Sequence, residues 1–265
     1  MSVKDGDERA NFDSAEAALS KASPKSGSLV VLPELFHCGY DWSFIRGLTE
    51  ADTARTISRL SDCAKRHSVF LIAGSIAEAR GDQKFNTSFV FDPDGNQIAR
   101  YSKAHLFSLF EEDRHICAGN SAVCVECGKA NVGLMICYDM RFPEHARRLA
   151  IDGAQILAVP SVWPLKRRHA WRTLAIARAI EQQCAVIAVN RAGIDSTGAD
   201  YGASLIVDSW GNVLAESEGS NEDTIEAEIS LDEVAKSRSH IPTFGERRPD
   251  VYRLDWELCN INALQ

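Results

Sequence analysis

Val132-Gly-Leu-Met-Ile-Cys-Tyr-Asp-Met-Arg-Phe-Pro-Glu144 is the stretch that decides the fold of this chain. Its apolar first part, from Val132 to Ile136, predicts a buried strand that stops at Cys137, just before a helix start. A thiol at such a strand end lies where backbone N–H groups can lower its pKa and bind an oxyanion. The stretch therefore predicts an α/β protein with Cys137 as a candidate nucleophile at one edge of a sheet.

Two charged side chains close similar runs elsewhere in the chain. Glu34 stands in Val30-Val-Leu-Pro-Glu-Leu-Phe36, and Lys103 stands in Tyr101-Ser-Lys-Ala-His-Leu-Phe107. An unpaired charge in apolar surroundings is costly, so we expect each of the two to have a partner. A carboxylate, an ammonium group and a thiol together suit acyl transfer through a covalent thioester.

Composition limits the class of protein. The chain has 265 residues, a formal net charge of -8 and 8 cysteines. One α/β domain over residues 1–265 is the expected organisation. The acidic balance argues against a nucleic-acid partner, and no apolar stretch approaches the roughly 20 residues of a membrane helix. Because the polar N-terminus has no signal-peptide core, we expect reduced thiols and a cytoplasmic location.

Predicted strands and helices alternate along the chain. Two β runs are each turned by an aspartate and a Gly-Asn pair, which predicts two similar hairpins. The expected helices are Ala15 to Ala22, Thr53 to His67, His169 to Gln183 and Leu231 to Ser239. The expected strands are Leu29 to Leu32, Val69 to Ile76, Gln155 to Pro160, Cys184 to Asn190 and Asp223 to Ile229, with hairpins over Ser88 to Ala99 and Ser204 to Ala215.

The ordered motifs resemble those of the nitrilase (carbon–nitrogen hydrolase) superfamily, within it the omega-amidase-like branch. The resemblance rests on three motifs centred on Glu34, Lys103 and Cys137 and covers about Asp7 to Leu254. It continues through Trp171 to Gln183, Val189 to Gly193 and Arg247 to Tyr252. It implies a four-layer αββα sandwich, hydrolysis of amides or nitriles with no cofactor and no metal, and a homodimer.

The resemblance also implies a role for each central residue. Glu34 is then the general base, Cys137 the nucleophile, and Lys103 the oxyanion stabiliser together with the backbone N–H of Tyr138. A second glutamate lies between the lysine and cysteine motifs in this family. Spacing favours Glu112 as this supporting glutamate, with its neighbour Glu111 left open as the alternative.

Several other polar and aromatic residues allow a structural reading beside a functional one. Trp163 and Asn190 follow strand ends and are candidates for the pocket wall, although packing and loop support explain them equally well. We expect Asp139 to pair with Arg141. The remaining expectations are packing or loop roles for His105 and His115, a strand rather than half a zinc site for Cys124 to Cys127, and an i,i+3 pair between Arg178 and Glu181.

One departure from the family concerns the N-terminus. The family opens with a strand that residues 1–9 do not supply, so Met1 to Arg9 are expected to form no internal strand. A sheet without that strand exposes an edge or leaves a groove. At the other end, residues 241–265 form a proline-punctuated apolar tail, which we expect at the dimer interface.

Three hypotheses for function follow. The first is an amidase that releases ammonia from a small dicarboxylic monoamide such as 2-oxoglutaramate. The second keeps the same site but a different substrate, a nitrile or an N-carbamoyl compound. The third is a catalytically idle homologue that acts as a binding or scaffold protein, against which the intact Glu34, Lys103 and Cys137 argue.

Overall fold

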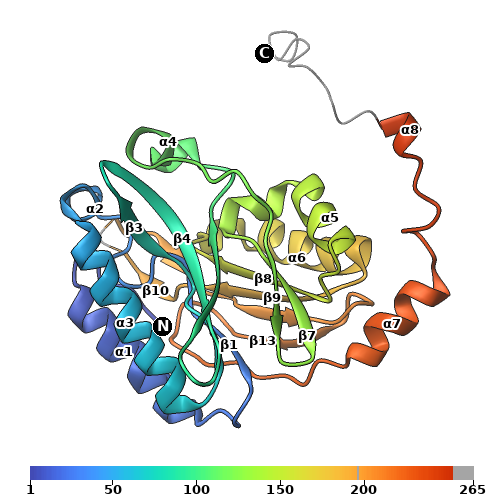
Figure 1. Cartoon of the computed structure of the whole chain (residues 1–265), viewed down its shortest axis with the longest axis horizontal. Helices are drawn as coiled ribbons and strands as arrows, with labels where there is room; N and C mark the ends of the chain where they lie inside the picture. The colour runs from blue at the N-terminus through green and yellow to red at the C-terminus, as the bar shows by residue number, and fades with distance from the viewer. Residues whose placement is uncertain (196, 253–265) are drawn as a thin grey trace.

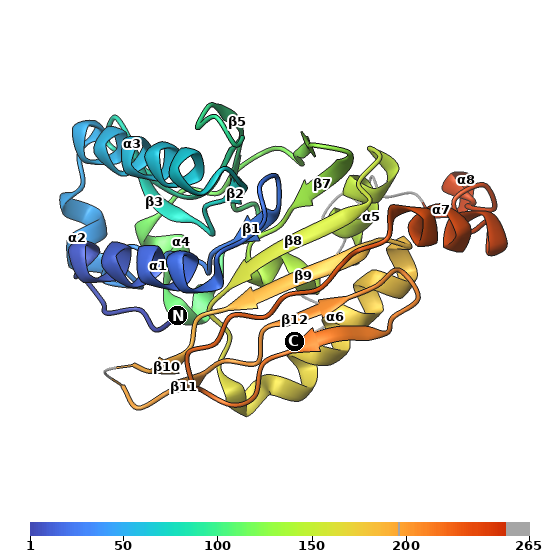
Figure 2. The same ribbon diagram turned by 90° about the horizontal axis from the view of Figure 1, so that it is seen from below.

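Two β-sheets pack face to face, and helices cover the outer face of each sheet (Figures 1 and 2). The computed structural model describes residues 1–195 and 197–252. Helices α1 (Glu8–Ala22) and α3 (Glu50–His67) cover the first sheet, and α5 (Pro143–Ile151) and α6 (Arg168–Gln182) cover the second. The expected four-layer αββα arrangement is confirmed.

The first sheet has the strand order β1-β2-β4-β3, with β5 on the other edge of β4. Its strands are β1 (Leu29–Val31), β2 (Phe70–Ile72), β3 (Ile76–Arg80), β4 (Gln83–Phe91) and β5 (Gln97–Ser102). Neighbouring side chains on a strand point to opposite faces. Leu71 and Phe89 therefore join the core under α1 and α3, whereas Ile72 and Val90 join the core shared with the second sheet.

A kink interrupts the strand expected from Val69 to Ile76. β2 and β3 both pair with β4 but are separated by residues 73–75. Gly74 has a φ of +56°, and a Cβ added there would lie 1.9 Å from the carbonyl oxygen of Pro33. Ser75 then accepts a hydrogen bond from the N–H of Leu35 at 2.9 Å. The kink thus fastens the sheet to the loop that carries Glu34.

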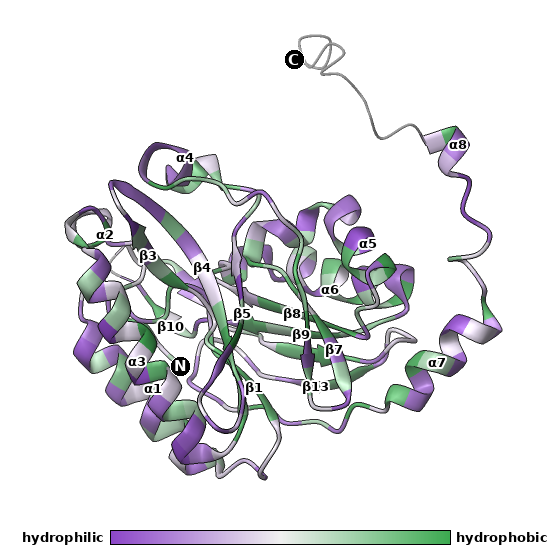
Figure 3. Ribbon diagram, viewed as in Figure 1, coloured by the Kyte–Doolittle hydropathy of each residue, from purple (hydrophilic) through white to green (hydrophobic). Residues whose placement is uncertain are grey.

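The second sheet brings several strand ends to one edge. Its order is β13-β12-β9-β8-β7-β6, and β7, β8 and β9 run parallel. β8 and β9 are hydrophobic over most of their length, as expected of strands buried on both faces (Figure 3). The strands are β6 (Cys124–Cys127), β7 (Ala130–Leu134), β8 (Ile156–Ser161), β9 (Ala185–Asn190), β12 (Leu205–Val207) and β13 (Val213–Glu216).

The two expected hairpins are confirmed, as β4–β5 and β12–β13. In the first turn Asp92 accepts hydrogen bonds from the N–H groups of Asp94 and Asn96. In the second, Asp208 accepts the equivalent bonds from Trp210 and Asn212. The same aspartate-centred turn therefore closes one hairpin in each sheet.

The expected helices form, with earlier starts for the first two. The Asp7 carboxylate accepts the N–H of Ala10 and caps α1, and Thr49 forms a capping box with Asp52 before α3. The remaining elements are α2 (Trp42–Gly47), η1 (Ser108–Phe110), α4 (Glu112–His115), η2 (Cys137–Arg141), η3 (Leu165–Arg167), β10 (Gly193–Ile194), β11 (Asp200–Tyr201), α7 (Leu231–His240) and α8 (Pro249–Tyr252).

The strand expected from Asp223 to Ile229 is wrong, because the segment has no pairing partner. Ile225, Ala227 and Ile229 are half-buried and alternate with exposed glutamates, as in a strand. Yet, in the described part of the chain, no backbone group of residues 222–229 hydrogen-bonds another backbone group. A cavity of about 380 Å³ lies between this segment and β1, and Met1 is part of its lining. The segment is thus extended beside an open groove.

Residues 1–9 add no strand to either sheet: Ser2 makes one isolated parallel bridge, to Ala192, and α1 begins at Glu8. We expect a variant with a β-branched apolar strand added before Met1 to melt several degrees higher. Such a strand would give hydrogen-bond partners to β1 and to residues 223–229. Each kcal/mol added to the free energy of unfolding raises Tm by about 2–4 °C in a chain of this size. Thermal melts against a Gly/Ser extension of equal length measure the effect. Equal midpoints would contradict the prediction.

After α7 the chain stays in contact with the body of the sandwich through Thr243 and Phe244, and α8 lies beyond these contacts (Figure 1). Ile241, Val251 and Tyr252 are exposed there, and residues 253–265 of the predicted tail lie outside the described residues. Within the described residues, no helix is both long and apolar enough to cross a membrane.

Candidate active site

The three residues that close the sequence motifs all follow strand ends. Glu34 lies three residues after β1, Lys103 directly follows β5, and Cys137 lies three residues after β7. Glu34 and Lys103 have no exposed surface, and Cys137 is 6% exposed. The structure brings them together with Glu112 in the space between the two sheets.

Lys103 joins two buried carboxylates. Its Nζ lies 2.8 Å from Oε1 of Glu34 and 2.7 Å from Oε1 of Glu112. The second oxygen of Glu112 accepts the N–H of Phe107 at 2.6 Å, in the loop that follows Lys103. Glu111 instead pairs with Arg114 at the surface. Of the two adjacent glutamates, Glu112 is therefore the one that faces Lys103.

Several hydrogen bonds hold the carboxylate of Glu34 in place. Beside Lys103, Oε1 accepts the Tyr40 hydroxyl and the Asn86 amide, each at 2.9 Å, and Oε2 accepts the N–H of Val162 at 2.9 Å. The Tyr40 hydroxyl also lies 2.8 Å from Glu112. Sequence reasoning missed Tyr40 and Asn86. Only the place of Tyr40, six residues after Glu34 and just beyond the same motif, offered a signal for it.

Cys137 occupies a strained turn beside these charges. Its φ is +48°, in the left-handed region that non-glycine residues rarely adopt, at the first residue of η2. The Sγ atom lies 3.6 Å from the carbonyl oxygen of Val162, whose N–H binds Glu34. Among the described residues the N–H of Tyr138 has no hydrogen-bond acceptor. The nucleophile candidate thus has a free backbone donor next to it.

Burial and charge set the protonation states. Burial raises the pKa of the Cys137 thiol well above its usual value and Glu34 raises it further, against the expectation of a lowered pKa. Burial also raises the pKa of Glu34, with Lys103 opposing. Burial would lower the pKa of Lys103, but Glu112 and Glu34 outweigh it and raise the pKa. The resting site therefore holds a neutral thiol, a charged lysine and a carboxylate of increased basicity.

Asp139 ties the Cys137 turn to the Lys103 loop. Its two oxygens accept the N–H of Ile136 at 2.8 Å, the Tyr101 hydroxyl at 2.8 Å, and the N–H and Nδ1 of His105 at 3.0 and 2.7 Å. The predicted pair between Asp139 and Arg141 is wrong, because the carboxylate points inward to these donors. The Arg141 guanidinium instead lies over the Trp163 ring, 4.7 Å from its centroid.

Trp163 and Asn190 lie at the ends of β8 and β9. The Asn190 side chain accepts the N–H of Trp163 and donates to its carbonyl, both at 2.7 Å, and also donates to the carbonyl of Gly202. The Trp163 ring packs against Trp171 with 5.5 Å between centroids. Asn190 thus supports the backbone beside Val162, and substrate contact by either residue stays a prediction.

The other polar candidates contact neighbouring protein side chains. His105 binds Asp139 and stacks on Phe142, and His115 stacks on Trp42. The pair between Arg178 and Glu181 is confirmed at 2.8 Å. Cys124 and Cys127 begin and end strand β6, as expected, and belong to no group of three metal-ligating side chains among the described residues.

Comparison with known proteins identifies the family. The family model described as carbon-nitrogen hydrolase matches residues 1–239. The 2-oxoglutaramate amidase of Bacillus subtilis is 40% identical over 91% of this chain and 93% of its own length. The human omega-amidase NIT2 is 34% identical over 92% of both chains. The crystal structure of Saccharomyces cerevisiae Nit3, a nitrilase-superfamily member, superposes with a TM-score of 0.85 at 31% identity over 94% of both chains.

The chain belongs to the carbon–nitrogen hydrolase family, of the nitrilase superfamily. Within the family it is an omega-amidase-like hydrolase, an amidase that acts on C–N bonds.

Proposed function

We propose that this amidase hydrolyses a small dicarboxylic monoamide, of the 2-oxoglutaramate type, through a thioester on Cys137. The observation that carries the proposal is the buried Lys103, shared by Glu34 and Glu112 beside that cysteine. The name of the Bacillus subtilis relative, 2-oxoglutaramate amidase, supports the substrate class.

Acylation begins with proton transfer from the Cys137 thiol to Glu34. Because the pKa of Glu34 is raised, the carboxylate is a stronger base than an exposed one. The thiolate attacks the amide carbon, and Lys103 and the N–H of Tyr138 bind the oxyanion that forms. The tetrahedral intermediate then collapses, the C–N bond breaks, and the leaving nitrogen takes the proton from Glu34 and departs as ammonia.

Deacylation uses the same groups with water. Glu34 takes a proton from a water molecule, which attacks the thioester carbon while the same oxyanion donors bind the oxygen. The C–S bond breaks, the thiolate recovers the proton from Glu34, and the carboxylic acid leaves. Glu112 supports both halves by holding Lys103 through its 2.7 Å contact. Tyr40 links the two glutamates and limits their movement.

Arg141 is the group we assign to the far carboxylate of the substrate. It is exposed, lies four residues after Cys137, and has no acidic partner within residues 1–195 and 197–252. An arginine that is free of protein carboxylates is suited to bind one from a ligand in a bidentate way. Trp163, beneath the guanidinium, would form the pocket wall between Arg141 and the reacting carbon.

A screen for ammonia release tests the proposal. Purified protein is offered short monoamides with and without a distal carboxylate, nitriles and N-carbamoyl amino acids, with Cys137→Ala as the control. We expect the dicarboxylic monoamides to react best and the control to be inactive. Preference for a nitrile, giving acid without free amide, or for a ureido acid, giving carbon dioxide as well, would show that the substrate class is wrong.

The role of Arg141 has its own prediction. In Arg141→Gln we expect KM for a dicarboxylic monoamide to rise at least tenfold, because one charge-assisted contact is lost. The KM for an uncharged amide of the same chain length should stay within about twofold. Steady-state kinetics on both substrates separate a loss of carboxylate binding from general damage to the enzyme. An equal loss on both would remove Arg141 from the substrate site.

The assembly we propose is a homodimer with the tail beyond α7 at its interface, and the compartment is the cytoplasm. The exposed apolar side chains of Ile241, Val251 and Tyr252 support the interface. The free state of every described cysteine supports the cytoplasmic location. Sedimentation of a chain ending at Ser239 should show weaker association than the full chain. If both run as monomers at micromolar concentration, the interface assignment fails.

A further inference from the structure

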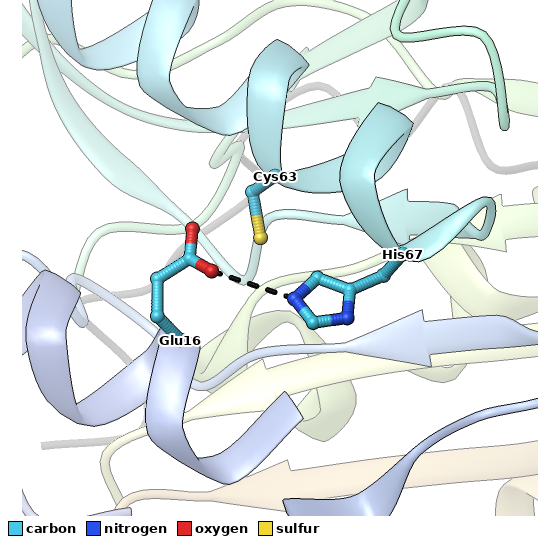
Figure 4. Close-up of side chains that lie close together, drawn as sticks. All are labelled: Glu16, Cys63 and His67. Atoms are coloured by element: carbon cyan, nitrogen blue, oxygen red, sulfur yellow. Dashed lines mark hydrogen bonds and ion pairs between the residues drawn. The ribbon is translucent and has the colours of Figure 1, made fainter. Parts of the chain in front are cut away.

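A second group of reactive side chains lies far from Cys137, in the outer helical layer. Glu16 projects from α1, and Cys63 and His67 project from α3 toward it (Figure 4). Cys63 and His67 are four residues apart and therefore share one face of their helix. A carboxylate oxygen, the sulfur and a ring nitrogen of these three residues all lie within 4.8 Å of one another.

The spacing is close to that of a tetrahedral zinc site. Oε2 of Glu16 and Nε2 of His67 are 3.4 Å apart. Two ligands that bind zinc at about 2.1 Å in a tetrahedron are separated by about 3.4 Å. The sulfur would lie about 3.6 Å from each of the other two ligand atoms, because its bond to zinc is about 2.3 Å long. A shift of about 1 Å or less in Cys63 therefore completes three of four coordination positions.

The surroundings leave one carboxylate oxygen of the cluster for a bound cation. Arg66 forms an ion pair with Oε1 of Glu16 and leaves Oε2 for the metal, as an outer residue that orients a ligating carboxylate does. Cys63 is buried, whereas the side chains of Glu16 and His67 are partly exposed. A water molecule would supply the fourth ligand. A set of thiolate, imidazole and carboxylate selects zinc or a similar transition metal over Mg²⁺ or Ca²⁺.

We propose that Glu16, Cys63 and His67 bind one Zn²⁺, which joins α1 to α3. Binding releases the thiol proton of Cys63 to solvent as the Zn–S bond forms. The amidase chemistry does not use these residues, since the hydrolysis is carried by groups between the sheets. The role of the ion is to fasten two helices that cover the same sheet.

Metal titration of the full-length Cys137→Ala protein tests the site, because this background removes the active-site thiol as a competing ligand. We expect one Zn²⁺ per chain by native mass spectrometry and a rise in Tm of about 5 °C at a hundredfold excess over Kd, with no rise from Mg²⁺. Co²⁺ should give a thiolate-to-metal charge-transfer band in the near ultraviolet.

Matched variants decide which residues bind. In the same background, Cys63→Ser and His67→Gln should each lose the Co²⁺ band or at least tenfold in Zn²⁺ affinity, whereas Cys127→Ser, a buried cysteine in β6, should keep both. Two chemically different variants protect the test if one fails to fold. No stoichiometric Zn²⁺, or a band that survives in Cys63→Ser, would overturn the proposal.

Discussion

Cys137→Ala is expected to abolish amide hydrolysis, with turnover at the level of the uncatalysed reaction. The reason is that, in the proposed mechanism, both half-reactions pass through the sulfur, and alanine offers no nucleophile to form the thioester. The wild-type enzyme stopped during turnover should carry one acyl group on Cys137, detected by peptide mass spectrometry. An adduct on Cys184 instead, or full activity in Cys137→Ser, would contradict the mechanism.

Glu34→Gln is the matched partner of that variant. It keeps the shape of the site and removes the proposed general base, so kcat should fall by about 10²–10⁴-fold. In the wild type, burial raises the pKa of Glu34, and the proposed mechanism requires its carboxylate form. Activity should therefore fall as pH drops through a pKa above the ordinary glutamate range, and the profile of kcat/KM measures this. An acid limb at or below the ordinary glutamate pKa would show that another group is the base.

The fold was predictable from local pattern because apolar runs and turn residues agree with it. The two aspartate-centred hairpins and the strands that precede Cys137 and Asn190 all follow from residue order alone. Two strand predictions failed for a physical reason that a local pattern does not contain. Gly74 breaks one strand by its approach to Pro33, and residues 223–229 have strand periodicity with no neighbour to pair with.

The site was predictable where a residue closes a motif, and not where it acts from another segment. Glu34 and Lys103 each mark a strand end in the first sheet and Cys137 marks one in the second, and the face-to-face packing of the two sheets brings these ends together. Tyr40 and Asn86 reach Glu34 through side-chain contacts that no spacing encodes. Glu112, which spacing favoured over Glu111, does face Lys103, and a left-handed backbone at Glu111, with φ of +60°, precedes the α4 turn that carries it.

Lys103→Met should be the most destabilising change at the site, because it leaves two buried carboxylates with no cation between them. Removing one partner of a buried ion pair costs about 3–5 kcal/mol, which corresponds to a fall in Tm of about 6–20 °C. Turnover should also be lost, because the proposed oxyanion donor is removed. Thermal melts of the variant measure the first effect and the amidase assay the second.

The control for this loss is Lys103→Met combined with Glu34→Gln and Glu112→Gln. This triple variant removes the uncompensated charges and should recover much of the stability while remaining inactive.

The pH dependence of the stability of Lys103→Met has a defined sign. Without Lys103 the main opposition to the burial that raises the pKa of Glu34 is lost, so the folded state binds protons more tightly than the unfolded state. Protonation of Glu34 then stabilises the folded state below the pKa that Glu34 has in the unfolded state. This stabilisation is lost as pH rises through the pKa of Glu34 in the folded state. The single variant should therefore melt closer to wild type near pH 5 than at pH 8, whereas the triple variant should lack this difference. A single variant as stable as wild type at pH 8 would mean that the two glutamates do not depend on Lys103 for their burial.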